Sequence, residues 1–210
     1  MENEAPQAKA RGIFSAFFGG AVTANAGSRC GGKIRRSRKF SHSSRRIGGS
    51  SAKADKNKIV VIGSDKLGEV LKNELSRSAN QQVEIIMIDK PFKWAVADAD
   101  IVFLNYPSRL ITKTLRQIKN WLKPGCVISD LSEKKEEITI EAEKILRNGV
   151  SFVGSLPLVD PKDVFSFHGK YWCLSSPLQT PNEQVLGQLI IGMGARIIII
   201  HPQIHDFLVD

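Results

Sequence analysis

Cysteine is scarce in this sequence: Cys30, Cys126 and Cys173 are the only three, and no CxxC pair occurs. An odd and widely spaced set of this kind argues against a disulfide framework and against a zinc site, and it fits a reducing compartment. Long apolar runs are missing as well, because two glycines and Arg196 interrupt the most apolar stretch, residues 190–200. A membrane-spanning helix needs about 20 apolar residues in succession. We therefore expect neither a metal site nor a membrane span.

Acidic residues are nearly absent from the first part of the chain. Residues 1–57 contain 12 of the 30 lysines and arginines but only three of the 21 acids, so they carry the whole net charge of +9, and residues 58–210 are neutral. This first segment is rich in Ser, Gly and Ala and has few large apolar side chains, so we expect a disordered extension. Leaders that are rich in Arg and Ser and poor in acids are typical of transit peptides, which would place the protein in a plastid or another organelle.

Two other interpretations of the extension stay open. Glu2 and Glu4 are unusual in a transit peptide, and a solvated tail with no targeting role would leave the protein in the cytoplasm. A basic tail could also contact nucleic acid or a membrane surface, but such binding would be salt-sensitive and blind to base sequence. Because residues 58–210 are neutral, we expect no specific nucleic-acid partner.

Residues 58–210 alternate short apolar runs with segments of helical period. The runs end at glycine or at polar residues, which is typical of buried parallel strands. This alternation predicts a doubly wound parallel sheet with right-handed crossovers, the Rossmann type of dinucleotide-binding domain. The predicted strands are residues 58–62, 83–88, 100–104, 126–129, 152–154, 171–174 and 196–200, and the predicted helices are residues 68–76, 108–122, 138–146 and 182–193, the last with Asn182 or Thr180 as its N-cap.

The first predicted strand runs into a glycine-containing turn, in the segment VVIGSDKLGEVL at residues 60–71. Gly63 and Gly68 occupy the first and third glycine positions of a G-x-G-x-x-G fingerprint, and we expect them to hold a dinucleotide together with Ser64 and Leu67. The second glycine position is Asp65, whose bulk and charge would oppose a pyrophosphate unless the carboxylate swings out. A Rossmann scaffold that keeps its packing glycines and has lost the cofactor would have the same sequence.

Polar residues follow the next three strands. Asp89 ends the second strand, 21 residues after Gly68, where an acid can accept hydrogen bonds from the adenine ribose and would repel a 2′-phosphate. This favours NAD over NADP, although an ordinary acid in a turn would look alike. Asn105 and Pro107 follow the third strand and Asp130 the fourth, where the nicotinamide half of a dinucleotide would lie. Turn chemistry alone would also explain Asn105 and Pro107.

Four further segments resemble a known family in their order and spacing: LKPGCVISD at residues 122–130, FVGSLPLVDPKDVFS at 152–166, YWC at 171–173 and GARIIIIHPQIHD at 194–206. The family is that of the prephenate dehydrogenases, particularly the bacterial type that is fused to chorismate mutase. The resemblance covers about 150 residues, from Lys58 to the end of the chain. It implies NAD(P)-dependent oxidative decarboxylation of prephenate or arogenate on the way to tyrosine, with one of these molecules as the small-molecule substrate.

The resemblance also implies a catalytic histidine that this sequence lacks. In the family, the histidine of a G-x-H-P-M segment takes the proton from the ring hydroxyl of the substrate. Here the segment reads Gly-Ser-Leu-Pro-Leu, and the expected histidine is Leu156. Leucine cannot accept a proton, so a general-base contribution of about 10²–10⁴ in rate is lost.

Other family motifs are kept in part. A D-x-x-S-x-K motif retains Asp130 and Lys135, while Glu133 stands where the serine is expected, and the late H-D pair is retained as His205 and Asp206. No catalytic residue can be assigned with the expected histidine missing, and His205 is the best remaining candidate. The predicted substrate contacts are Ser108, Lys135 and His205.

The last departure is one of length. The resemblance implies a helical C-terminal domain that builds the dimer, and the chain ends at Asp210, so we expect that domain to be absent and leave the oligomeric state open. The leading hypothesis is a degenerate prephenate/arogenate dehydrogenase-like protein with reduced or no activity as this chain, binding NAD or no cofactor. The alternative is a non-catalytic Rossmann module that binds a nucleotide or a protein partner. A sequence cut short before the rest of the enzyme would explain the same ending.

Overall fold

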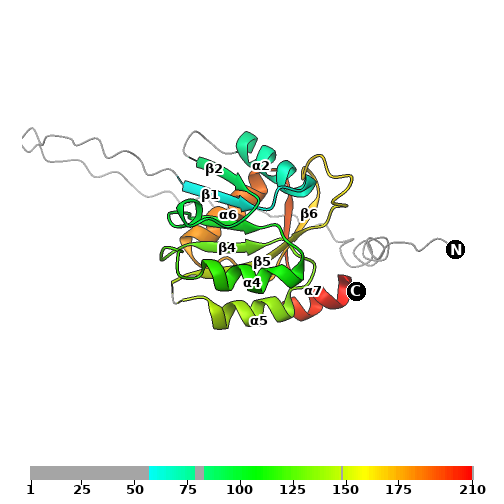
Figure 1. The fold of residues 1–210 in the computed structure, drawn as a ribbon. Coiled ribbons are helices and arrows are strands. Elements are labelled where there is room, and N and C mark those ends of the chain that lie inside the picture. Colours follow the sequence, from blue (N-terminus) through cyan, green and yellow to red (C-terminus); the bar gives the residue numbers. More distant parts are fainter. Residues whose placement is uncertain (1–56, 79–82, 148, 210) are drawn as a thin grey trace, which may run out of the picture.

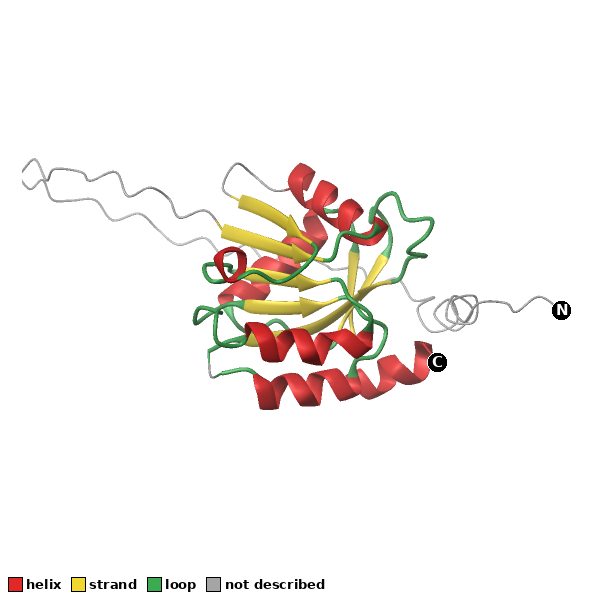
Figure 2. Cartoon of the chain, viewed as in Figure 1, coloured by secondary structure: helices red, strands yellow, loops and turns green. Residues whose placement is uncertain are grey.

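The computed structural model describes residues 57–78, 83–147 and 149–209. The extension predicted for residues 1–57 lies outside these ranges, except for Asn57, with which the first strand begins. In the described part, a seven-stranded sheet carries helices on both faces (Figures 1 and 2). The prediction of a doubly wound, Rossmann-type α/β domain is therefore confirmed.

The first five strands are parallel and stand in the order β2-β1-β3-β4-β5. All residues of the two inner strands β3 and β4 are buried, as expected where helices cover both faces of a sheet. The order reverses between β1 and β3, and ligands of open α/β sheets bind outside the carboxyl ends of the strands at such a reversal. The five strands are β1 (Asn57–Ile62), β2 (Val83–Ile88), β3 (Ile101–Leu104), β4 (Val127–Asp130) and β5 (Ser151–Pro157).

Alternating side chains of β1 divide the core into two layers. Ile59 and Val61 pack in one cluster with Leu71, while Val60 and Ile62 pack in the other. The first layer lies under α2 (Lys66–Ser78) and α6 (Pro181–Gly192), and the second lies under α3 (Lys93–Val96), α4 (Ser108–Ile118) and α5 (Glu136–Ile145).

Helix α6 begins where the sequence offers two caps, and the structure selects Thr180. Its hydroxyl accepts the Glu183 N–H at 3.3 Å, and the Glu183 carboxylate accepts the Thr180 N–H at 2.8 Å. This reciprocal pair is a capping box, which satisfies two N–H groups at the start of the helix. The other candidate, Asn182, instead donates from its side chain to the carbonyl of Gly125 at 2.6 Å.

The last two strands depart from a fully parallel sheet. β6 (Tyr171–Leu174) runs antiparallel to β5, and β7 (Arg196–Ile199) runs parallel to β6. No helix connects β5 to β6, so the chain returns from the same edge of the sheet and must run back along its neighbour. β5 also continues to Pro157, three residues beyond the predicted end, because the residues after Gly154 pair with β6.

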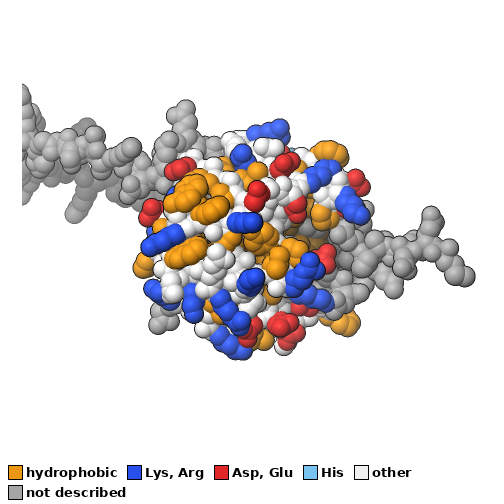
Figure 3. All heavy atoms as spheres, in the orientation of Figure 1, with side chains coloured by type: hydrophobic (Ala, Val, Ile, Leu, Met, Phe, Trp, Pro, Cys, Tyr) orange, Lys and Arg blue, Asp and Glu red, His pale blue; other side chains and the backbone are white. Residues whose placement is uncertain are grey.

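A final helix, α7 (Pro202–Val209), lies next to α5, as Figures 1 and 2 show. Neither α7 nor the single-turn helix α3 was predicted from the sequence. None of the helices in the described ranges has the length and apolar character that a membrane span needs. Lysine and arginine side chains are interspersed with acidic ones on the face shown in Figure 3, in line with the neutral charge of residues 58–210.

Candidate nucleotide-binding and catalytic site

The two glycines of the first turn are required by packing. Gly63 has a φ of +112°, and a Cβ atom there would lie 2.2 Å from the Asn105 carbonyl oxygen. A Cβ atom on Gly68 would lie 2.1 Å from the Gly63 carbonyl oxygen. The ends of β1 and β3 and the start of α2 therefore lie too close together for a side chain at either position. Both glycines are therefore needed to build the turn, whether or not a ligand binds there.

Asp65, in the second glycine position, lies at the start of α2 and caps it. One oxygen of its carboxylate accepts the Gly68 backbone N–H at 3.0 Å and the side-chain amide of Asn105 at 2.5 Å. The Asp65 carbonyl oxygen accepts the Glu69 N–H at 2.9 Å. In dinucleotide-binding domains the pyrophosphate lies at this end of the helix, close to the backbone. The residues present here do not fit that group, because a carboxylate already occupies the N–H group that would face it.

Asp89, the predicted ribose acid, stands at the end of β2 on the other side of this turn. The Ser64 hydroxyl donates to its carboxylate, and the Tyr106 hydroxyl donates to its backbone carbonyl. Burial, and next the charge of Asp89, raise the pKa of the Tyr106 hydroxyl. Asp89 itself is exposed, so its carboxylate remains accessible on the outer side of the turn.

Asn105 connects the ends of β1 and β3. It is buried, its N–H donates to the Ile62 carbonyl at 2.8 Å, and its side-chain amide donates to Asp65. Pro107 precedes α4, and the hydroxyl of Ser108 accepts the Lys134 N–H at 3.3 Å. The structure thus brings Gly68 and Asn105 together at Asp65 and places Ser64 against Asp89. Ser108 lies beside the loop that carries Lys134.

A buried ion pair lies beyond the end of β4. The ammonium group of Lys135 is 2.8 Å from the Asp130 carboxylate, and neither side chain is more than 1% exposed. The same carboxylate oxygen accepts the Ser132 hydroxyl at 2.5 Å, and Lys135 also donates to the Ser132 carbonyl. Burial lowers the pKa of Lys135 and the Asp130 charge opposes that effect. Ser132 therefore supplies the hydroxyl that the family motif would place at position 133.

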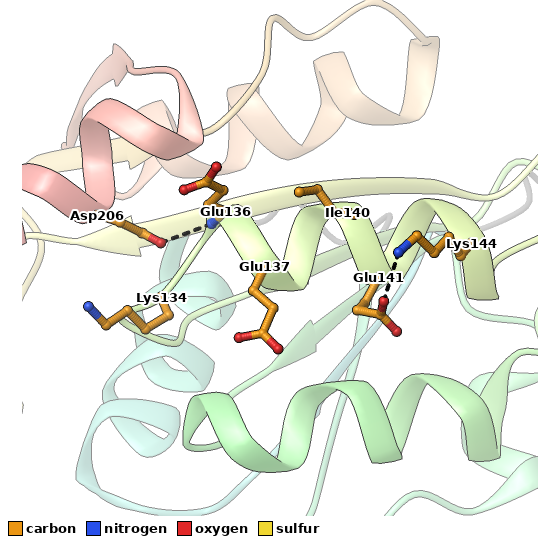
Figure 4. Close-up of a pocket in the computed structure, with 7 residues that line it drawn as sticks. All are labelled: Lys134, Glu136, Glu137, Ile140, Glu141, Lys144 and Asp206. Atoms are coloured by element: carbon orange, nitrogen blue, oxygen red, sulfur yellow. Dashed lines mark hydrogen bonds and ion pairs between the residues drawn. The ribbon is translucent and has the colours of Figure 1, made fainter.

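Helix α7 contributes the H-D pair to the same cluster. The Asp206 carboxylate accepts the backbone N–H groups of Lys135 at 2.7 Å and Glu136 at 3.0 Å, so it caps α5. Partial burial raises the pKa of Asp206, but the N–H of Glu136 and the His205 ring outweigh it, and the net shift is downward. Figure 4 shows Asp206 pointing toward the first turn of α5.

His205 is 3% exposed and does not face an open cavity. Its Nδ1 is 3.1 Å from Asp206, and its buried Nε2 has no hydrogen-bond partner among the described residues. Burial lowers the pKa of the ring, so the imidazole is neutral near pH 7. Asp130 also has one buried oxygen without a partner in the described part of the chain.

Position 156 lies in β5, at the edge of the sheet where catalysis would be expected. Leu156 is half-buried and is paired with Cys173 of β6. The neighbouring Ser155 is buried, and its hydroxyl is 2.8 Å from that of Ser129. Apart from the buried His205, the described residues include only two histidines, His168 and His201, and both are exposed.

A family model for the nucleotide-binding domain of prephenate dehydrogenase matches residues 50–199. The chain belongs to the prephenate dehydrogenase family. No match was found among curated protein sequences.

Solved structures share the fold. Prephenate dehydrogenase from A. aeolicus, in complex with hydroxyphenyl propionate and NAD+, has a TM-score of 0.62 at 18% identity, over 72% of this chain and 62% of that one. For Synechocystis arogenate dehydrogenase the TM-score is 0.60 at 20% identity, over 71% and 61% of the two chains. For the 3-hydroxyisobutyrate dehydrogenase of Mycobacterium tuberculosis, the TM-score is 0.54 at 13% identity, over 69% of this chain and 54% of that one. The chain thus spans about three-fifths of the prephenate and arogenate dehydrogenases that it resembles.

In this prephenate dehydrogenase-family domain, a groove of about 440 Å³ lies along α5, away from the glycine turn (Figure 4). Its lining is mainly charged, with Glu137 and Glu141 among its residues, and it reaches the site at Lys134, Glu136 and Asp206. No cluster of His, Cys, Asp and Glu in the described ranges could hold a metal ion.

Sequence reasoning missed two features of the site: the capping role of Asp65 and that of Asp206. An Asp three residues before Gly68 is the usual N-cap spacing, so the first could have been read from the sequence. Asp206 lies 70 residues from the N–H group that it accepts, and local sequence carries no signal for such a contact.

Proposed function

We propose that this chain is a prephenate/arogenate dehydrogenase-like protein that has reduced or no catalytic activity as it stands. The observation that carries the proposal is Leu156, an aliphatic side chain at the position where the family resemblance requires a proton acceptor. Oxidative decarboxylation of prephenate or arogenate needs a base at the hydroxyl of the ring. The positioned base is worth about 10²–10⁴ in rate.

Among the described residues, no other imidazole is placed to replace the missing base. His205 is buried, and Asp206 engages its Nδ1. Its free nitrogen, Nε2, is also buried, so a substrate hydroxyl cannot reach it without a movement of α7. His168 and His201 are exposed, and neither ring forms an ion pair with a carboxylate of the described residues that would orient it as a base.

The ligand class follows from the family and from Asp89. The A. aeolicus relative was solved with NAD+ and hydroxyphenyl propionate, and the Synechocystis relative is an arogenate dehydrogenase. By this likeness the ligands are a nicotinamide dinucleotide and prephenate or arogenate. An exposed acid at the end of β2 would repel the 2′-phosphate of NADP, so NAD is the preferred form of any dinucleotide that binds.

A second candidate function is a non-catalytic Rossmann module that binds a nucleotide or a protein partner. The same observation favours it, since Gly63 and Gly68 are explained by packing and Leu156 leaves no base. A module of this kind would bind its ligand and release it unchanged.

The test is NADH formation by the purified full chain with NAD and either prephenate or arogenate. We expect no turnover above the enzyme-free rate. Leu156→His alone should not restore it, because the Asp65 carboxylate still opposes the pyrophosphate of the dinucleotide. His201→Gln, at an exposed position, serves as a matched control. A turnover on the order of 1 s⁻¹ or more with the wild-type chain would overturn the proposal.

A further inference from the structure

We infer that the Asp65 carboxylate takes the place of the ligand diphosphate at the start of α2, and that the turn therefore discriminates against NAD and NADP. The inference rests on the proposed function, whose dinucleotide would lie at the turn of residues 63–68, as the sequence predicts. It adds a specificity-determining residue to that site, because Asp65 opposes ligands that carry a diphosphate.

The carboxylate occupies groups that an anionic ligand would use. Backbone N–H groups at the start of a helix, together with the positive end of the helix dipole, attract phosphate. Here the Gly68 N–H donates to Asp65 at 3.0 Å. A phosphate oxygen could form that hydrogen bond only after the carboxylate had left.

Asn105 holds the carboxylate from the other side. Asp65 is exposed, so a hydrogen bond from one N–H group alone would leave it free to turn outward. The Asn105 amide donates to the same oxygen at 2.5 Å, and Asn105 is itself fixed by burial and by its N–H bond to Ile62. Two donors from β3 and α2 therefore keep the carboxylate over the turn.

The other side of the turn is also satisfied internally. The Ser64 hydroxyl donates to the Asp89 carboxylate, and this hydrogen bond links the turn after β1 to the end of β2. Like charges close together repel. A diphosphate would thus be opposed by the Asp65 carboxylate, while the exposed Asp89 carboxylate remains available to ribose hydroxyls. A nucleoside without phosphate meets only Asp89, which can accept its ribose hydroxyls.

The experiment is isothermal titration of the full chain with NAD and, separately, with adenosine. Three proteins carry the argument: wild type, Asp65→Asn and Asp65→Gly. The Asn side chain can keep both hydrogen bonds while removing the charge, and Gly removes the side chain. Glu69→Gln is the matched control, since Glu69 is an exposed acid in the first turn of α2 that has no bond to Gly68 or Asn105.

We expect NAD to bind the wild type no tighter than about millimolar, Asp65→Asn more tightly, and Asp65→Gly more tightly by about tenfold or more. Adenosine should show no change across the series, and Glu69→Gln should behave as wild type. Should Asp65→Gly fail to fold, Asp65→Asn still tests the charge. Equal NAD affinity in wild type and both Asp65 variants would overturn the inference, as would an adenosine affinity that rises in parallel.

The outcome is separable from that of the proposed function. Tight binding of NAD by the wild type without turnover would overturn the inference alone. NADH formation by the wild type at a turnover on the order of 1 s⁻¹ or more would overturn the proposed function and the inference together. An Asp65→Gly protein that binds NAD and still forms no NADH would support both.

Discussion

The carboxylate of Asp206 in α7 accepts the backbone N–H of Glu136 at the start of α5, 70 residues earlier in the chain, at 3.0 Å. A second bond, from the Lys135 N–H, makes the contact bidentate. The first turn of α5 thus depends on a residue from the last helix, and the buried Lys135–Asp130 pair lies directly behind it.

Replacing Asp206 with Ala should therefore lower the free energy of unfolding. Loss of a helix cap costs about 0.5–2 kcal/mol, and the charged acceptor places this site toward the upper end. Urea denaturation measures the loss. Glu137→Gln, an exposed acid in the same turn of α5, is the control and should change stability by less than about 0.5 kcal/mol. Equal effects of the two substitutions would show that Asp206 does not cap α5.

Stability should fall as the pH is lowered below neutrality, because of His205. Burial lowers the pKa of its ring in the folded state below the ordinary value of about 6.5. The unfolded chain therefore binds the proton first as the pH drops, and unfolding becomes more favourable between pH 6.5 and the folded-state pKa. Asp206 adds a loss at lower pH, since its pKa is also depressed in the folded state.

The measurement is the urea midpoint at several pH values between about 5 and 7.5. His205→Gln should reduce the slope of stability against pH in that window, and His201→Gln, at an exposed position, should leave the slope unchanged. A slope that survives His205→Gln would assign the proton to another group.

Lys135→Met should destabilise the domain strongly. It leaves the Asp130 carboxylate buried without its cation, and breaking a buried pair in this way costs about 3–5 kcal/mol. The double variant Asp130→Asn/Lys135→Met removes both charges and should recover part of the loss. Chemical denaturation of the three proteins gives the coupling energy. A single-variant loss below about 1 kcal/mol would mean that the pair contributes little.

Residues 1–56 should be dispensable for the folded domain. The net charge of the chain is confined to residues 1–57, and β1 begins only at Asn57. A protein that starts at residue 57 should keep the melting temperature of the full chain, and limited trypsin digestion should leave a fragment that begins near Lys58. A melting temperature that falls by several degrees on truncation would show that the extension packs on the domain.

The same segment can be tested as a targeting sequence. A fusion of residues 1–57 to a fluorescent protein should enter a plastid or another organelle if the segment is a transit peptide. Removal of its six arginines between residues 29 and 46 should then disperse the signal. Diffuse fluorescence from the unaltered fusion would favour a plain tail.

Much of the fold follows from the sequence because the inner strands are buried on both faces and the strands are bounded by residues that cannot continue them. The apolar run of β3 and the glycine after β1 are such signals. The direction of β6 could not be predicted in this way, since YWCL has the same pattern in either orientation and only the missing crossover helix distinguishes them. Helix α7 was not predicted, because the segment HPQIHD was interpreted only as a family motif.

The sequence was sufficient to name residues of the candidate site, but it did not predict the contacts between them. Asp89 and Asn105 were selected by their place at the end of a strand, and Asp65 by its place in the glycine fingerprint. That the amide of Asn105 faces Asp65 depends on the relative height of β1 and β3 in the sheet, which only the register of Ile62 with Leu104 determines. Likewise, Lys135 was known as a motif residue, but its complete burial follows from α7 closing over it.

The three glycine positions of the turn differ in how well the fold tolerates a substitution there. Alanine at position 63 or 68 would force a Cβ atom to within about 2.2 Å of a backbone oxygen, so such a chain would be lost with its fold. An Asp at position 65 meets no such barrier, and it gains a helix cap. The fold therefore tolerates the loss of the middle glycine, and it does not tolerate the loss of either outer one. The outer glycines are therefore an indicator of the fold, and the residue at the middle position is an indicator of dinucleotide binding.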